Sequence, residues 1–164
     1  MIKFLPLGGA DDIGAGCFYL NIFGTGILLD CGIYPRKKGI DSLPKFELLK
    51  DLPVDFIFIS HAHQDHLGAL PFLVQSIPHV IIFSTVQTKE IAEITLHNAA
   101  NILAHNQPDE NQLRNYTHEE IDLLVRSINE VVYDETFQVK GMRHNSESPI
   151  QITFIDAGHI LGAA

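Results

Sequence analysis

The sequence lacks the features of membrane and secreted proteins. It contains no uninterrupted apolar run of the roughly 18 residues that a membrane-spanning helix needs. Its first residues do not show the basic, apolar and small-residue order of a signal peptide. Its two cysteines, Cys17 and Cys31, are too few for a disulfide scaffold and lack the spacing of a metal site. We therefore expect a cytoplasmic protein without a membrane span, in which both cysteines are small buried side chains.

Positive charge is also scarce. The 11 Lys and Arg residues stand against 20 Asp and Glu residues, and the net charge is −9 with histidine neutral. Proteins that bind nucleic acid usually present a basic surface, so this balance argues against a broad phosphate-binding face. It does not exclude a nuclease, because bound divalent cations would add positive charge where a phosphodiester must touch. The most basic stretch is residues 33–53, and its three adjacent cations, Arg36 to Lys38, fit a solvated loop better than a phosphate contact.

The sequence does contain enough apolar material for a core. Its 164 residues are 46% hydrophobic, and a chain of this length buries roughly 70% of its unfolded surface. Runs with strand periodicity are expected at 2–7, 17–23, 27–30, 54–60, 79–84, 131–133, 136–139 and 150–155. Helical spacing is expected at 45–50, from 67 onward, from about 88 to 103, and after a capping box at Thr117. The apolar stripe expected to face the core on the third of these helices is Ile91, Ile94, Ala99, Ile102 and Leu103.

The most informative stretch is His61-Ala62-His63-Gln64-Asp65-His66. It follows a predicted buried strand and precedes helical spacing, so it lies in the kind of turn where α/β proteins build sites. Three imidazoles and a carboxylate this close together each need a polar partner, and protonated imidazoles would repel one another. A divalent cation removes that conflict. These ligand types suit zinc, with manganese or iron as alternatives, and further ligands must come from elsewhere in the chain.

The pattern His-x-His-x-Asp-His after a hydrophobic strand resembles the second motif of the metallo-β-lactamase superfamily. Residues 28–32, Leu-Leu-Asp-Cys-Gly, resemble its first motif, and residues 156–163, Asp-Ala-Gly-His-Ile-Leu-Gly-Ala, resemble its third. The amino-acid sequences of these motifs, together with residues 8–14 and 61–71, are most similar to the β-CASP branch. That branch holds nucleases such as ribonuclease J and the endonuclease that cleaves messenger-RNA precursors at their 3′ ends.

The resemblance implies a set of site residues. The implied ligands are His61, His63 and His159 for one metal and Asp65 and His66 for a second. Asp65 and His66 would also be catalytic, with Asp65 positioning a hydroxide that two metal ions activate. Asp30 could be a turn former, but we favour the role that the resemblance implies, which is to accept a hydrogen bond from a ligand histidine.

The resemblance also implies the fold. We expect an α/β protein, the amino-terminal part of an αββα sandwich, with residues 1–164 as one incomplete metallo-β-lactamase domain. A β-CASP domain and the carboxyl-terminal part would be absent, together with an Asp that bridges both metals and a final His ligand. We therefore expect this chain alone to bind its second metal weakly and to show little or no activity.

Two other parts of the sequence receive less specific interpretations. The Gly-rich residues 8–16 lack the Lys of a phosphate loop and the third Gly of a dinucleotide fingerprint, which disfavours a nucleotide cofactor. They form either a flexible turn or a loop beside the site. His97 and His105 have no partners at ligand spacing along the sequence, and His118 lies in a predicted helix cap. We interpret all three as surface or helix-end residues.

Three functions remain open on the sequence alone. The first is a zinc-dependent nuclease that cleaves RNA or DNA, internally or from an end. The second is a hydrolase of the same superfamily that acts on a small ester, thioester or lactam, because the shared metal motif does not choose the substrate. The third is a non-catalytic module that associates through an unpaired sheet surface, for example as a homo-oligomer.

Overall fold

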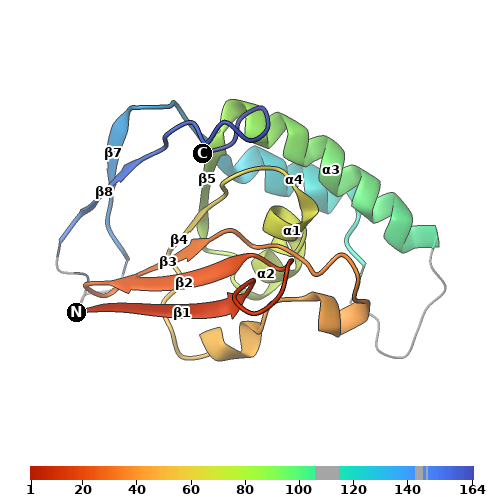
Figure 1. Ribbon diagram of the computed structural model, residues 1–164, viewed down its shortest axis with the longest axis horizontal. Coiled ribbons are helices and arrows are strands. Elements are labelled where there is room, and N and C mark those ends of the chain that lie inside the picture. The colour runs from red at the N-terminus through yellow and green to blue at the C-terminus, as the bar shows by residue number, and fades with distance from the viewer. Residues whose placement is uncertain (106–114, 143–145, 147) are drawn as a thin grey trace.

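The computed structural model describes residues 1–105, 115–142, 146 and 148–164 (Figure 1). The strands are β1 (Ile2–Gly8), β2 (Cys17–Ile22), β3 (Thr25–Leu29), β4 (Phe56–Phe58), β5 (Ile81–Thr85), β6 (Ile128–Val131), β7 (Thr136–Val139) and β8 (Ile150–Thr153). The helices are α1 (Gln64–Leu67), α2 (Leu70–Ser76), α3 (Val86–His105) and α4 (His118–Ser127), with 3₁₀ turns η1 (Gly39–Ser42) and η2 (Phe46–Leu49).

Strands β1 to β6 form one sheet whose spatial order follows the sequence. The first three strands are antiparallel, and the β2–β3 hairpin closes through Phe23 and Gly24, both at positive φ as a two-residue hairpin turn requires. From β3 to β6 the strands are parallel. Parallel neighbours need crossover connections. The segment with η1 and η2 connects β3 to β4, α1 with α2 connects β4 to β5, and α3 with α4 connects β5 to β6. β7 and β8 pair as a separate antiparallel sheet.

The sheet has an apolar core on each face. Side chains alternate along a strand, so Leu28, Ile57 and Ile82 belong to the core on the helix side. Their neighbours Phe56, Phe58 and Phe83 belong to the opposite core, which includes residues of β7 and β8. Figure 1 shows β7 and β8 away from α3 and α4. This layering of helix, sheet and second sheet confirms the predicted α/β fold and matches the amino-terminal part of an αββα sandwich.

The predicted core face of α3 is wrong in part. Ile94 and Ile102 are 72% and 56% exposed, whereas Ala92, Leu96 and Ala100 are buried. The buried residues are spaced by four and form one face of the helix, and two alanines allow the helix to approach the sheet closely. The small residues therefore decide the packing, although the larger isoleucines dominate the hydropathy pattern.

The predicted start of α4 is confirmed. Thr117 Oγ1 accepts a hydrogen bond from Glu120 N at 3.1 Å, and Thr117 N donates to Glu120 Oε2 at 2.8 Å, which is a capping box. The helical spacing of apolar residues in the sequence continues through Ile128, but the helix ends at Ser127 because Ile128 is already the first residue of β6. The predicted strand at 131–133 therefore begins earlier than expected.

Both cysteines lie in the core of the folded chain. Cys17 and Cys31 are fully buried and free, as predicted. Burial, together with the neighbouring Cys17 thiol, raises the pKa of Cys31 well above the ordinary range, so this thiol stays protonated near pH 7. In the part of the chain that the structure describes, no helix is both long and apolar enough to cross a membrane.

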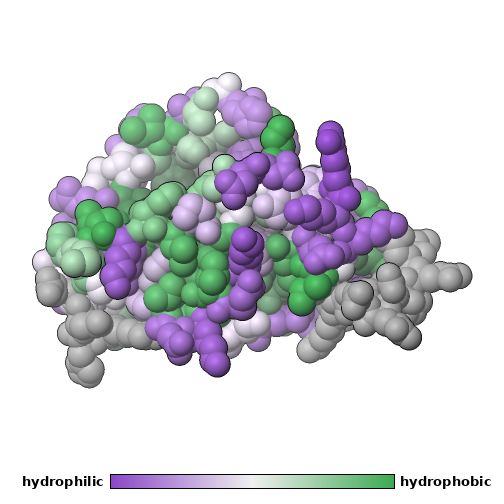
Figure 2. Space-filling model, turned by 60° about the horizontal axis from the view of Figure 1, so that its bottom comes forward, coloured by the Kyte–Doolittle hydropathy of each residue, from purple (hydrophilic) through white to green (hydrophobic). Residues whose placement is uncertain are grey.

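The edge strand β1 carries exposed apolar side chains. Ile2 and Phe4 are 61% and 60% exposed, and the Phe4 and Phe18 rings stack on each other. Figure 2 shows apolar surface interrupted by hydrophilic side chains when the bottom of the molecule is turned forward. Such a surface is compatible with the predicted association through an unpaired part of the sheet, which stays a prediction.

Candidate metal centre

The metal-binding motif spans the turn after β4 and the single-turn helix α1. His61 follows the strand, His63 is the extended residue that precedes α1, and Asp65 and His66 lie within that helix. A helix this short cannot bond its own last carbonyl groups. Backbone amides of distant loops bond to them: Gly16 N donates to Asp65 O at 2.8 Å and Cys31 N to His66 O at 2.7 Å. Gln64 O, at the start of the helix, accepts from Ile33 N at 3.0 Å as well as from Gly68 N at 2.8 Å.

Two loops therefore hold the motif in place, and each approaches it closely. A Cβ atom added to Gly32 would lie 1.7 Å from Asp65 O, and one added to Gly16 would lie 3.1 Å from the same atom. Gly16 ends the Gly-rich stretch 8–16, so the end of that stretch borders the site. Of the two interpretations of these residues, the structure supports the loop beside the site.

Asp30 connects the first motif to the second. It lies directly after β3, is buried, and has a φ of 61°. Its carboxylate accepts hydrogen bonds from Ser60 N, Ser60 Oγ and His66 Nδ1, each at 2.7 Å. The bond with Asp30 raises the pKa of His66. Because His66 Nδ1 donates to Asp30, the neutral ring keeps its lone pair on Nε2, which lies 3.8 Å from Asp65 Oδ2.

The same carboxylate orients His61 through Ser60. The Ser60 hydroxyl donates to Asp30, so its oxygen accepts from His61 Nδ1 at 2.9 Å and leaves His61 Nε2 unprotonated. Burial lowers the pKa of His61 to about 4, and the charge on His66 adds to the shift. His61 is therefore neutral near pH 7, which is the form that binds metal.

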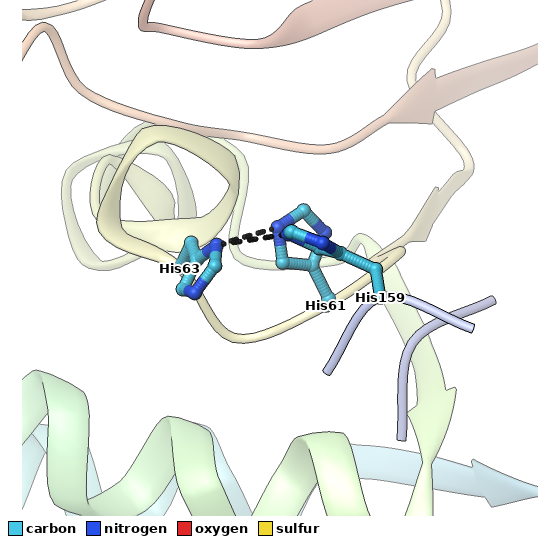
Figure 3. A group of neighbouring side chains, drawn as sticks. All are labelled: His61, His63 and His159. Carbon is cyan, nitrogen blue, oxygen red and sulfur yellow. Dashed lines mark hydrogen bonds between the residues drawn. The ribbon is translucent and has the colours of Figure 1, made fainter. Parts of the chain in front are cut away.

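Three ring nitrogens converge in front of α1. His63 Nδ1 lies 3.0 Å from His61 Nε2 and 3.4 Å from His159 Nε2, as the dashed lines in Figure 3 show. The ligand atoms of these histidines all lie within 4.8 Å of one another. Two nitrogens bound tetrahedrally to zinc at about 2.0 to 2.1 Å are separated by about 3.3 Å. The observed spacing fits a divalent ion among the three rings.

Asp65 and His66 form a neighbouring pair. The His66 ring centroid lies 4.1 Å from that of His61, so the pair adjoins the three-histidine group. Among the described residues, the groups whose ligand atoms all lie within 4.8 Å do not include Asp65 or His66. The structure thus places every predicted site residue in one region, and the assignment of each to a particular metal stays a prediction.

His159 reaches the site on the segment that follows β8. The carbonyl of Gly162 accepts hydrogen bonds from Thr85 Oγ1 at 2.7 Å and Thr88 Oγ1 at 2.8 Å. The amide of Ala164 donates to Ser60 O at 2.9 Å. These contacts hold the segment against β5, α3 and the turn that carries His61. They explain how an exposed histidine is held beside two residues almost 100 positions away.

Comparison with known families agrees with this geometry. The sequence model described as metallo-beta-lactamase superfamily domain matches residues 19–164. The chain belongs to the metallo-β-lactamase superfamily. The resemblance predicted from the three motifs is therefore confirmed, and membership in this superfamily implies that the chain binds divalent metal.

Curated relatives of this superfamily chain match it from end to end. Cleavage and polyadenylation specificity factor 73 of Drosophila melanogaster is 35% identical over 165 residues, covering 100% of this chain and 22% of the relative. Endoribonuclease YSH1 of Eremothecium gossypii is 33% identical over 169 residues, covering 99% and 20%. Cleavage and polyadenylation specificity factor subunit 3-I of Arabidopsis thaliana is 30% identical over 160 residues, covering 97% and 21%.

The chain thus spans about a fifth of the length of the curated relatives it matches. Their names agree with the β-CASP branch that the motif sequences predict. That branch includes the endonuclease that cleaves messenger-RNA precursors at their 3′ ends.

Loss of the bonds to Gly162 is expected to weaken the metallo-β-lactamase metal centre. In a Thr85→Val/Thr88→Val variant, the buried Gly162 carbonyl loses both side-chain donors, which costs about 1 to 2 kcal/mol of unfolding free energy. Because His159 is then held less firmly, zinc affinity is expected to fall about tenfold. Urea denaturation and competition with a chelator measure the two effects. Thr136→Val, which removes an exposed hydroxyl that is hydrogen-bonded to Thr153 in the neighbouring strand β8, is the matched control and is expected to keep wild-type affinity.

One group of potential ligands was missed from the sequence. His97 and His118 lie at the surface as predicted, but the interpretation that His97 lacks partners is wrong. His97 Nδ1 lies 2.6 Å from His118 Nδ1, and His97 Nε2 lies 3.1 Å from Asp122 Oδ1. The sequence signal for this group is the spacing of its residues within each helix. Glu93 and His97 are four residues apart, as are His118 and Asp122, so each pair lies on one helix face. His105 has a helical backbone, and its side chain lies outside the described part of the structure.

Proposed function

We propose that this chain is the metal-binding part of a nuclease that hydrolyses phosphodiester bonds in RNA. The observation that carries the proposal is the convergence of three histidine nitrogens within 4.8 Å, in a chain matched along 99% of its length by a relative named endoribonuclease. The match supports RNA over DNA as the substrate. It also supports a phosphodiester over the small esters, thioesters and lactams that the motif alone leaves open.

In this proposal, two divalent ions are bound side by side. His61, His63 and His159 hold the first, and Asp65 and His66 contribute to the second. Nitrogen and carboxylate ligands suit zinc, with manganese as the alternative. By the same family resemblance, we propose that a complete enzyme adds the remaining ligands and a β-CASP domain from outside residues 1–164. The chain alone is then expected to cleave RNA slowly or not at all.

The chain's own residues prepare the site for this chemistry. Bound divalent ions supply Lewis acidity, which activates water and offsets charge on the phosphate. Asp30 holds His66 directly and His61 through Ser60, so both rings present Nε2. Asp65 is placed beside His66 Nε2 to accept a hydrogen bond from the attacking water. Because the chain carries a net charge of −9, the phosphate must be attracted locally at this centre rather than by a broad surface.

Zinc content tests the ligand assignment. His63 Nδ1 faces both other histidines of the group, so His63→Ala is expected to lower the zinc retained by the chain by at least one ion. Elemental analysis after zinc loading and dialysis gives the number of ions per chain. His79→Ala is the matched control, because it removes an exposed imidazole from the turn before β5. A His63→Ala variant with wild-type zinc content contradicts the assignment.

Substrate class is tested on the zinc-loaded chain. Binding of a fluorescent single-stranded RNA oligonucleotide is expected to require zinc and to be lost in His63→Ala, and any cleavage is expected to be lost in Asp65→Asn. Zinc-dependent hydrolysis of a thioester or lactam, without RNA binding, would support the small-molecule hydrolase instead. Preference for DNA over RNA of the same sequence would overturn the choice of RNA.

A further inference from the structure

A second group of metal-binding side chains lies between α3 and α4 and shares no residue with the three-histidine group. Glu93 and His97 are four residues apart on α3, and His118 and Asp122 are four residues apart on α4. Residues with this spacing lie on one face of a helix. The structure brings the two faces together, and the ligand atoms of Glu93, His97 and Asp122 all lie within 4.8 Å of one another.

When His97 is neutral, the hydrogen bonds of this group leave its Nε2 without a proton. His118 Nε2 donates to Asn101 Oδ1 at 3.2 Å, so His118 Nδ1 accepts from His97 Nδ1 at 2.6 Å. A neutral His97 then carries a lone pair on Nε2. That nitrogen lies 3.1 Å from Asp122 Oδ1, which is also an acceptor. Two acceptors face each other, and a cation between or beside them removes the conflict.

We propose that Glu93, His97 and Asp122 bind a zinc ion at this surface, and that His118 orients the His97 ring. One imidazole and two carboxylates are ligands that zinc accepts, with water completing four-coordination. The two carboxylate charges balance the charge of the ion. The contact of His118 with His97 Nδ1 resembles the way metal-bound histidines are usually oriented through their second nitrogen. The proposal does not depend on the function proposed above.

The surroundings leave room for such an ion. Glu93 and Asp122 line a surface hollow of about 540 Å³, which Lys89, Val125 and Arg126 also line. Lys89 Nζ donates to Ile128 O at 3.0 Å and Glu130 Oε1 at 2.9 Å, so its charge is directed towards β6. Arg126 is exposed, and water screens its repulsion of a bound cation.

The ion would join two helices that are distant in sequence. α3 also contributes to the three-histidine region, because Thr88 holds the Gly162 carbonyl and Thr95 O accepts a bond from Gln64 Nε2 at 3.1 Å. A zinc ion between α3 and α4 would therefore stabilise the helix against which that region packs. Since Glu93 and His97 of α3 separate from Asp122 of α4 on unfolding, zinc binds the folded chain preferentially and raises its thermal midpoint.

Equilibrium dialysis against zinc tests the site separately from the three-histidine group. The His63→Ala chain is expected to bind one more zinc ion per chain than the His63→Ala/His97→Ala chain. Asp122→Asn is expected to weaken this ion at least tenfold. Glu119→Gln, which neutralises an exposed carboxylate on the same helix, is the matched control and is expected to leave it unchanged. His118→Ala is expected to weaken binding less than His97→Ala does, because His118 acts through His97.

A measurement on the unmodified chain covers the case in which a variant fails to fold. On zinc addition, the ring nitrogen resonances of His97 are expected to shift at Nε2, and His118 is expected to show a smaller change. Equal zinc content with and without His97, or His97 resonances that respond to pH but not to zinc, overturns the proposal. The group would then be an ion pair between protonated His97 and Asp122.

Discussion

Gly32→Ala is expected to be among the most damaging single substitutions in this chain. The added Cβ would lie 1.7 Å from Asp65 O, 2.0 Å from Asp65 C and 2.6 Å from His66 N. These are backbone atoms of the metal-binding motif, so no flexible side chain can move aside. Overpacking against side chains typically costs about 1 to 3 kcal/mol, and we expect a loss of about 3 kcal/mol or more here. Urea denaturation of the metal-free chain measures it.

The same variant is expected to lose the metal centre. Moving Asp65 and His66 by an ångström displaces α1 from the amides of Gly16 and Cys31 that bond its carbonyls. Gly158→Ala gives the comparison, because a Cβ there meets nothing within 4 Å and only the positive φ of 63° opposes it. That change is expected to cost about 1 kcal/mol. If Gly32→Ala is no less stable than Gly158→Ala, the close approach of the two loops is not as described.

Asp30→Ala is expected to reduce both stability and metal affinity. It removes the acceptor of three hydrogen bonds from Ser60 and His66 and places alanine at a φ of 61°. Buried donors without partners cost about 1 to 3 kcal/mol each, and such losses are not additive, so we expect about 3 kcal/mol in total. Because Asp30 orients His66 directly and His61 through Ser60, zinc affinity is expected to fall by about 10- to 100-fold or more.

Two companion variants separate the causes. Asp30→Asn tolerates the left-handed backbone but cannot accept all three bonds, so it is expected to recover part of the stability and little of the affinity. Asp55→Ala removes another buried carboxylate, which accepts from Gly26 N and Met142 N at 2.8 and 3.1 Å and lies outside the metal motifs. It is expected to lower stability while zinc affinity stays within about twofold of wild type. Equal zinc affinity in Asp30→Ala and wild type would contradict the orienting role of Asp30.

Several features of this protein could be predicted because their causes are local. The capping box at Thr117 depends on residues three positions apart, and it forms as predicted. Strands β1 to β5 follow apolar runs bounded by glycine or proline. The position of His61, His63, Asp65 and His66 after a buried strand also follows from neighbouring residues. The family resemblance added Asp30 and His159, which no local pattern connects to the cluster.

Features that depend on contacts between distant segments were decided by the tertiary structure. The core face of α3 depends on how closely Ala92 and Ala100 let the helix approach the sheet, so hydropathy alone selected the wrong isoleucines. The pairing of His97 with Asp122 requires α3 and α4 to pack together.

The sequence by itself determined which side chains are available for metal binding and which strands carry them. Only the tertiary structure decided which nitrogen of each ring faces its neighbours, because Asp30 and Ser60 select the free nitrogens of His66 and His61 across contacts between separate strands. The folded chain likewise holds His159 Nε2 3.4 Å from His63 Nδ1, because the hydroxyls of Thr85 and Thr88 bond the Gly162 carbonyl. These bonds form only after the sheet has assembled, since residue type and spacing do not specify the direction of a lone pair.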